Sequence, residues 1–233
     1  NPASVTLDST PIEGNLLRAT TFHRTDQSGS SISGTGWTLV FEEEVSLGDS
    51  DYRRAMAVYE KIAGASEPTN IQTNWGSGLN NKLLVEEFSP QSGKVWNQRE
   101  TYISNNNGNT SNDDNYTTGT TSSVPAGDLH AWSIIGMKAN GGLGTSVAWT
   151  NGFGDNAGSQ ASGAFGLALW SGHKNNTSGG TFESQADITD ATNTGLISGL
   201  IVWSMSDENA PPANAGTRLR GGNLKIRGGT KIQ

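Results

Sequence analysis

The chain carries one series of sequence landmarks twice. Both halves contain the same four features in the same order: a turn glycine, a tryptophan followed by threonine, an apolar segment that ends in an aromatic residue, and a leucine-rich segment. The matching positions are Gly14 and Gly127, Trp37 and Trp149, Tyr59 and Trp170, and Leu83 and Leu200. The steps between partners are 113, 112, 111 and 117 residues. Such a nearly constant step predicts two halves that share one order of structural elements.

Apolar and polar residues alternate in most segments, which is the period of a β-strand. The sequence therefore predicts an all-β fold, an antiparallel jelly-roll-like β-sandwich built from two internally duplicated halves. We expect a single domain over residues 1–233. Its first half covers about 8–104, a polar connection 105–123, its second half about 124–208, and a C-terminal strand 216–233. Two small sandwiches in tandem are the alternative.

The segment from Tyr52 to Ala63 contains good helix formers and is the one place where a helix competes with a strand. Its counterpart, Ala164 to Gly172, is rich in glycine and would make a poor helix. If the halves share a fold, both segments are strands. The repeat therefore predicts a strand over 52–63.

Composition excludes several classes of function. The net charge of −7 and the pI near 4.9 argue against nucleic acid as a partner, because phosphate contacts need a basic surface. The absence of cysteine excludes a thiol nucleophile and fits assembly in a reducing cytosol. Apolar runs are all much shorter than the roughly 20 residues of a membrane helix, so we expect no membrane insertion.

Glu86 and Glu87 are the strongest candidates for a pair of catalytic carboxylates. Because adjacent side chains of a strand point to opposite faces, the two cannot act on one bond. They also align with Trp203 and Ser204 of the second half. We interpret both as solvent-facing charges, assign no catalytic residue, and expect that the protein is not an enzyme.

Metal and cofactor signals are equally weak. The three histidines, His23, His130 and His173, lack companions at ligand spacing, and no Gly-x-Ser-x-Gly elbow precedes a helix. Asp and Asn residues at 112–115 and 187–190 offer oxygen ligands for calcium, but neither stretch follows the EF-hand pattern. The glycines lie between strands, not before helices as in phosphate-binding loops. We therefore assign no metal and no cofactor.

Tryptophan gives the alternative function, a carbohydrate-binding module or receptor-binding tip. Trp75 and Trp96 lie near predicted loops, and with Tyr116 they form the candidate sugar platform. Trp37 and Trp149 occupy matching positions on alternating strands, so we expect them in the core. A cell-surface glycan would be the partner of this platform.

The order of motifs in the first half resembles a known class of protein. A Pro…Gly-Asn-Leu-Leu turn over 11–17 precedes Gly36-Trp37-Thr38-Leu39, which is followed by Ala-Val-Tyr-Glu-Lys-Ile-Ala over 57–63 and by Glu67-Pro68. This order is similar to that in β-sandwich proteins of tailed-bacteriophage virions. The second half departs from it, since Ala148-Trp149-Thr150 replaces Gly-Trp-Thr and no Glu-Pro follows.

The resemblance implies a virion protein, assembled in the host cytoplasm as a head decoration, a fibre or a tail-associated component. We expect a non-enzymatic structural role through self-association, as a homo-oligomer, and through docking on other virion proteins. The repeat does not account for the two ends of the chain, so they are the predicted docking regions. Their candidate residues are Val5, Leu7, Arg218, Arg220, Lys225 and Arg227. A glycoside hydrolase is the least favoured function.

Overall fold

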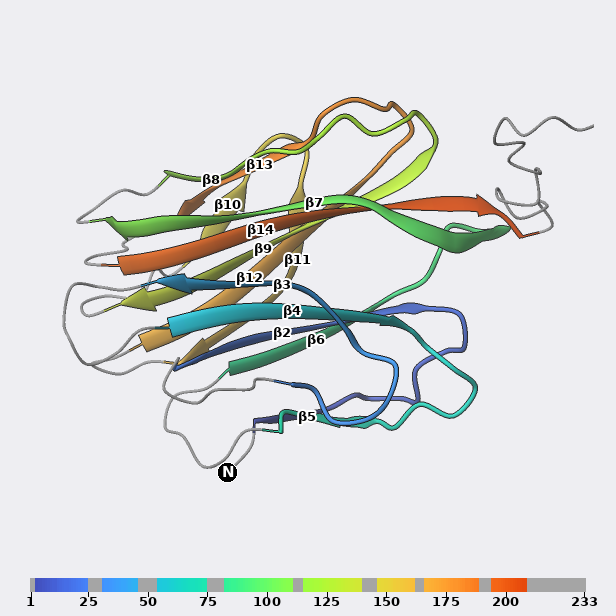
Figure 1. Cartoon of the computed structure of the whole chain (residues 1–233), viewed down its shortest axis with the longest axis horizontal. Coiled ribbons are helices and arrows are strands. Elements are labelled where there is room, and N and C mark those ends of the chain that lie inside the picture. The colour runs from blue at the N-terminus through green and yellow to red at the C-terminus, as the bar shows by residue number, and fades with distance from the viewer. Residues whose placement is uncertain are drawn as a thin grey trace, which may run out of the picture.

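The structure is a computed structural model that describes residues 3–24, 31–45, 54–74, 82–110, 115–139, 146–161, 166–188 and 194–208. These residues form fourteen β-strands in antiparallel sheets (Figure 1), which confirms the predicted all-β sandwich class. The jelly-roll arrangement itself stays a prediction. Within the described ranges, no helix is long and apolar enough to cross a membrane.

The strands are, in chain order, β1 (Ser4–Thr6), β2 (Leu16–Arg24), β3 (Thr38–Val45), β4 (Arg54–Ile62), β5 (Asn70–Gln72), β6 (Lys82–Phe88), β7 (Lys94–Thr110), β8 (Asn115–Thr120), β9 (Asp128–Ala139), β10 (Val147–Trp149), β11 (Gly154–Ala161), β12 (Gly166–Asn176), β13 (Glu183–Ile188) and β14 (Thr194–Asp207).

Four sheets are stacked as layers. The two larger ones have the strand orders β3-β4-β2-β6 and β11-β12-β9-β14-β7, and they pack face to face. The pair β1-β5 covers the outer face of the four-stranded sheet, and the sheet β10-β13-β8 covers that of the five-stranded sheet. Both large sheets are therefore covered on each face, which explains why several of their strands read as continuous apolar runs.

The main core lies between the two large sheets. It includes Phe22 and Met56 from one sheet and Trp132 and Ile201 from the other, all fully buried. Burying each side chain of this size contributes roughly 1.5–3 kcal/mol to folding. Mid-strand glycines allow the sheets to approach closely here, since a Cβ atom on Gly136 would lie 2.8 Å from the sulfur of Met56.

The segment for which the sequence allowed a helix or a strand is a strand, β4. It pairs with β2 on one side and with β3 on the other, and its first seven residues are all buried. Met56 and Val58 face the five-stranded sheet, whereas Ala57 and Tyr59 face the β1-β5 layer. The strand predicted over 52–63 is confirmed. Its tertiary position overrides the helix propensity of its residues.

The two halves of the chain pair their strands in the same order. In the first half β4 and β6 flank β2, β3 adds to β4, and β1 pairs with β5. In the second, β12 and β14 flank β9, β11 adds to β12, and β8 pairs with β13. Two halves with one order of elements would pair in this way, although a duplication of the chain stays a prediction.

Two stretches of small or polar residues form strands. The polar stretch predicted as a connection over 105–123 contains the end of β7 and the whole of β8, because its backbone pairs with β14 and β13. The small-residue stretch from Gly158 to Ala161 belongs to β11, which pairs with β12. In both places backbone hydrogen bonding builds a strand without an alternating apolar pattern. The predicted C-terminal strand lies outside the described residues.

Candidate functional site

A network of charged side chains is buried between the two large sheets. Arg18 of β2 is fully buried and donates through Nε to Oε1 of Glu60 at 2.7 Å, while Arg99 of β7 donates to Oε2 at 3.2 Å. The indole N–H of Trp203 on β14 lies 3.0 Å from both oxygens of the same carboxylate. Glu60, 2% exposed, is therefore held by groups from both sheets.

Glu86 occupies a second buried position next to Arg18. Its two oxygens accept hydrogen bonds from Trp132 Nε1 at 3.0 Å and from Ser171 Oγ at 2.6 Å. The interpretation of Glu86 as a solvent-facing charge is wrong, since the residue is 6% exposed. Its neighbour Glu87 points to the opposite face of β6, as expected, and accepts from Ile12 N and Asn15 Nδ2.

Arg18 makes its remaining contacts through aromatic rings. Its guanidinium carbon lies 4.9 Å from the ring centroid of Trp132 and 5.3 Å from that of Phe88. No hydrogen-bond partner for Nη1 or Nη2 is found in the part of the chain that the structure describes. Burial lowers the pKa of the guanidinium, and the ion pair with Glu60 opposes that effect. The cation is thus stabilised by two carboxylates and two rings.

Two histidines lie beside this network. The rings of His130 and His173 are 5.4 Å apart, and both lie against Phe88. Burial first, and the positive charge of Arg18 second, lower the pKa of His130 to about 3 and also lower the pKa of His173. Both rings are therefore neutral near pH 7, and His130 Nδ1 lies 3.0 Å from Asn175 Oδ1.

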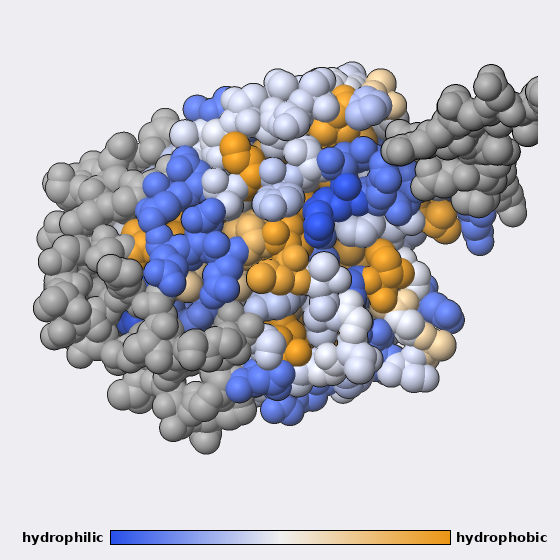
Figure 2. Space-filling view, in the orientation of Figure 1, coloured by the Kyte–Doolittle hydropathy of each residue, from blue (hydrophilic) through white to orange (hydrophobic). Residues whose placement is uncertain are grey.

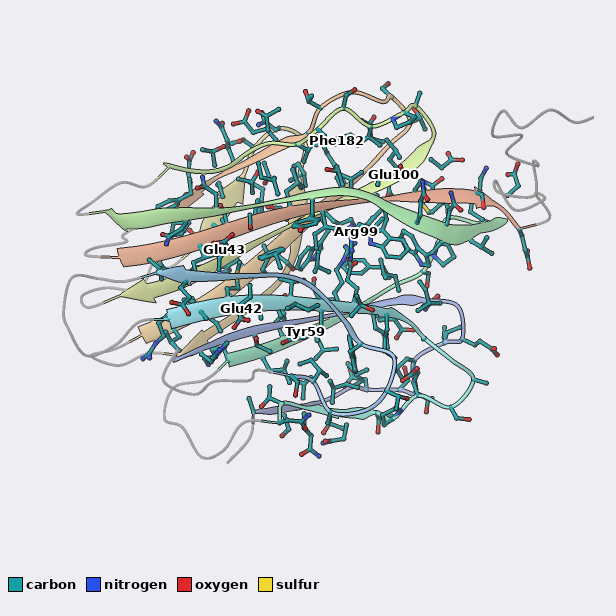
Figure 3. All side chains as sticks on the ribbon, in the orientation of Figure 1. Glu42, Glu43, Tyr59, Arg99, Glu100 and Phe182 are labelled. Atoms are coloured by element: carbon teal, nitrogen blue, oxygen red, sulfur yellow. The ribbon has the colours of Figure 1, made fainter. Side chains whose placement is uncertain are left out.

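The network reaches the surface at one open hollow of about 410 Å³. It lies between the start of β3 and the first half of β7, and its lining residues are Gly36, Thr38, Glu60, Lys61, Ile62, Arg99 and Trp203. Figure 3 shows Arg99 on the side of β7 that faces β3 and β4, whereas its neighbour Glu100 lies on the opposite side. The volume falls in the range of small-ligand sites.

The hollow has one carboxylate and one partly exposed guanidinium among the described residues that line it. Glu60 is the one carboxylate among the described residues that line it, and each of its oxygens already accepts two hydrogen bonds. A glycosidase needs two carboxyl groups facing one bond. Arg99, by contrast, is partly exposed and makes one hydrogen bond among the described residues. Its other N–H groups can donate to an oxygen acceptor placed in the hollow.

The motif that resembles virion proteins is a structural unit. Lys61 Nζ lies 5.3 Å from the ring centroid of Trp37, donates to the carbonyl oxygen of Thr35 at 3.0 Å and lies 2.6 Å from Glu67 Oε2. Glu67 also accepts from the backbone N–H of Gly64. These contacts tie the start of β3 to the turn after β4. A similar contact occurs in the second half, where Lys174 Nζ lies 4.6 Å from the ring of Phe153.

The predicted sugar platform is not assembled by the described residues. Tyr116 is buried in the cluster beneath β10-β13-β8, so its interpretation as an exposed platform is wrong. Trp96 is half-buried, donates to Phe88 O and lies against Trp203 and His130. Trp75 lies outside the described residues. Trp37 and Trp149 are half-buried and pack against apolar clusters, so they lie at the margin of the core in which they were expected.

The predicted docking residues divide into two groups. Val5 and Leu7 pack on the outer face of the four-stranded sheet of their own chain, and Val5 pairs with Ile71. They are half-buried against their own chain, and their role in docking stays a prediction. The basic candidates Arg218, Arg220, Lys225 and Arg227 lie outside the described residues.

Metal candidates also fall mostly outside the described ranges. The Asp and Asn stretch at 112–115 is described at Asn115, and the stretch at 187–190 at Asp187 and Ile188. Within the ranges that the structure covers, no three His, Asp or Glu residues are grouped in a way that could hold a metal ion.

The buried network leaves a weak signal in the sequence. Arg18, Glu60 and Glu86 each lie in a strand with apolar residues two positions away on the same face, so period-two alternation could have placed them inside. No pattern in one strand indicates that charges on three strands meet.

No protein-family model, curated protein or solved structure matches the chain.

Proposed function

We propose that the protein is a non-enzymatic structural component of a tailed-bacteriophage virion, a head decoration, a fibre or a tail-associated protein. It acts by self-association and by docking on other virion proteins. The virion assignment is supported by the motif order of the first half, from Gly36-Trp37-Thr38 to Glu67-Pro68.

One observation carries the non-enzymatic part of the proposal. The two buried carboxylates, those of Glu60 and Glu86, accept hydrogen bonds across the two large sheets. Glu60 accepts from Arg18, Arg99 and Trp203, and Glu86 accepts from Trp132 and Ser171. The oxygens of these carboxylates are thus occupied by donors of the protein itself, which leaves them badly placed to take a proton from a substrate. The network therefore fits a stable scaffold that binds other proteins.

The proposal is tested on purified virions that contain this chain. Quantitative mass spectrometry should find the protein in intact particles in many copies per particle. Sedimentation equilibrium of the isolated full-length chain should show a weight-average mass that rises with concentration. A chain that stays monomeric and binds no capsid or tail protein would contradict the proposal.

A further inference from the structure

The chain is divided into an acidic body and a basic end. Residues 209–233 contain five basic side chains and no acidic one, a formal charge of +5. Residues 1–208 contain ten basic and 22 acidic side chains, a formal charge of −12. A basic segment of this kind is typical of an interaction tail, and the acidic surface that complements it is present on every copy of the same protein.

Basic and apolar residues alternate within this end. Arg218-Leu219-Arg220 and Leu224-Lys225-Ile226-Arg227 both place apolar residues one position from basic ones. In an extended conformation, Arg218 and Arg220 share a side with Leu224 and Ile226, and Leu219 shares the other side with Lys225 and Arg227. Each side of such a segment therefore carries apolar and basic side chains together. The segment is suited to a sheet edge that offers both an apolar surface and acidic groups.

The structure contains such an edge, which we call the β3–β7 edge. It consists of the exposed residues of β3 and β7 together with Ile62 and the hollow described above. Each strand stands at the end of its large sheet in the described part of the chain. The two are joined where Ser104 Oγ donates to Glu43 at 2.6 Å and where the ring of Phe41 stacks on that of Tyr102.

The β3–β7 edge carries both apolar and acidic side chains. Three of the most exposed large apolar side chains of the described structure, Leu39, Ile62 and Tyr102, are 44–47% exposed there. Its acidic residues are Glu42, Glu43, Glu44 and Glu100. Figure 2 shows apolar and hydrophilic surface side by side on the face that carries β3 and β7. Figure 3 shows Glu42 and Glu43 beside β3, and Glu100 on β7.

The chemistry of the hollow also suits a segment of this kind. An apolar side chain of the segment can enter the hollow between Ile62 and Trp203. The free N–H groups of Arg99 can donate there to a backbone carbonyl oxygen, the acceptor that every extended segment carries.

The exit of the chain favours a second copy as the acceptor. β14 ends at Asp207, paired with Lys94 at the start of β7, and in Figure 1 both lie at the right-hand end of the molecule. Pro211 and Pro212 follow within five residues and favour an extended backbone over a reversal. A stiff, extended exit favours an acceptor on another copy over the edge of the same copy.

We propose that the basic C-terminal segment, residues 217–231, binds the β3–β7 edge of a second copy of the chain. This inference rests on the proposed function, because it names the contact through which self-association occurs. Head-to-tail contacts of this type form rings or filaments, which are the usual products of a heterologous interface.

The test uses two full-length variants. The segment variant carries R218S, R220S, K225S and R227S, and the edge variant carries E42K and E100K. Sedimentation velocity over about a hundredfold range of protein concentration should show self-association of the wild type, weakened about tenfold or more in each variant. Raising NaCl from about 0.05 M to about 0.5 M should weaken the wild-type contact as well, because the interface is ionic.

Mixing the two variants distinguishes a contact between copies from one within a copy. The edge variant retains a basic segment and the segment variant retains an acidic edge, so the mixture should form 1:1 pairs and nothing larger. A mixture that remains monomeric would overturn the inference.

The apolar part of the contact has its own matched pair of variants. Ile62→Asp should weaken self-association about tenfold, whereas Ile12→Asp, at an exposed site in the turn before β2, should leave it unchanged.

If the wild type associates and the segment variant associates equally well, the inference fails and the proposed function stands. If the wild type does not associate at all, the proposed function itself fails.

Discussion

The buried network makes one strong prediction about stability, which is that Arg18→Met unfolds far more easily than the wild type. Arg18 is fully buried, pairs with Glu60 at 2.7 Å and is attracted to Glu86. Methionine fills a similar volume but leaves two buried carboxylates with less positive charge beside them. Breaking a buried ion pair on one side costs roughly 3–5 kcal/mol. For a chain of this size that lowers the melting temperature by roughly 6–20 °C.

The assay is equilibrium denaturation followed by tryptophan fluorescence, because Trp132 and Trp203 both donate to the network. Lys94→Met is the matched control, since Lys94 makes its ion pairs with Asp128 and Asp207 near the surface and should change the midpoint little. Glu60→Gln should also cost less in the Arg18→Met background than alone, because the two residues share one interaction. An Arg18→Met protein with the wild-type midpoint would refute the reasoning.

Acid and packing give two further predictions. The pKa of His130, about 3, and that of His23, about 4, lie below the ordinary value because of burial. Below pH 6.5 the unfolded chain therefore binds protons that the folded chain does not. The free energy of unfolding should then decrease as the pH is lowered from about 6.5 to about 4. His130→Phe should flatten that dependence in denaturant titrations, and an unchanged slope would contradict the assignment. Gly199→Ala should lower the free energy of unfolding by roughly 1–3 kcal/mol, and with it the denaturation midpoint, because a Cβ there would overlap the ring of Phe41. Gly127→Ala, with open space around it, is the control, and equal midpoints would show that the two sheets are not packed so closely.

Much of the fold could be predicted from period and repetition. Alternation indicated the all-β class, and the repeat identified β4 as a strand against its helix propensity. β11 and the second half of β7 could not be found in this way. Their residues are small or polar, and they are strands because neighbouring strands offer backbone partners. Pairing between distant segments leaves no local signal.

The candidate site was less accessible to sequence reasoning. Glu86 was singled out, but its burial depends on Trp132 and Ser171, which lie 46 and 85 residues away in the chain. The meeting of Arg18, Glu60 and Arg99 likewise requires the packing of one sheet on the other. Exposure of Tyr116 was predicted from a polar neighbourhood, whereas the neighbouring sheet covers it. Side-chain environments made by non-local packing are beyond a single sequence.

The central claim is that this chain is a repeated structural part of a virion, held there by contacts between copies. Cryo-electron microscopy of the intact particle tests it most directly. The account predicts several copies side by side, each with density from its C-terminal segment on the β3–β7 edge of the next copy. Particles that lack the chain, or that hold isolated copies with no contact between them, would contradict it.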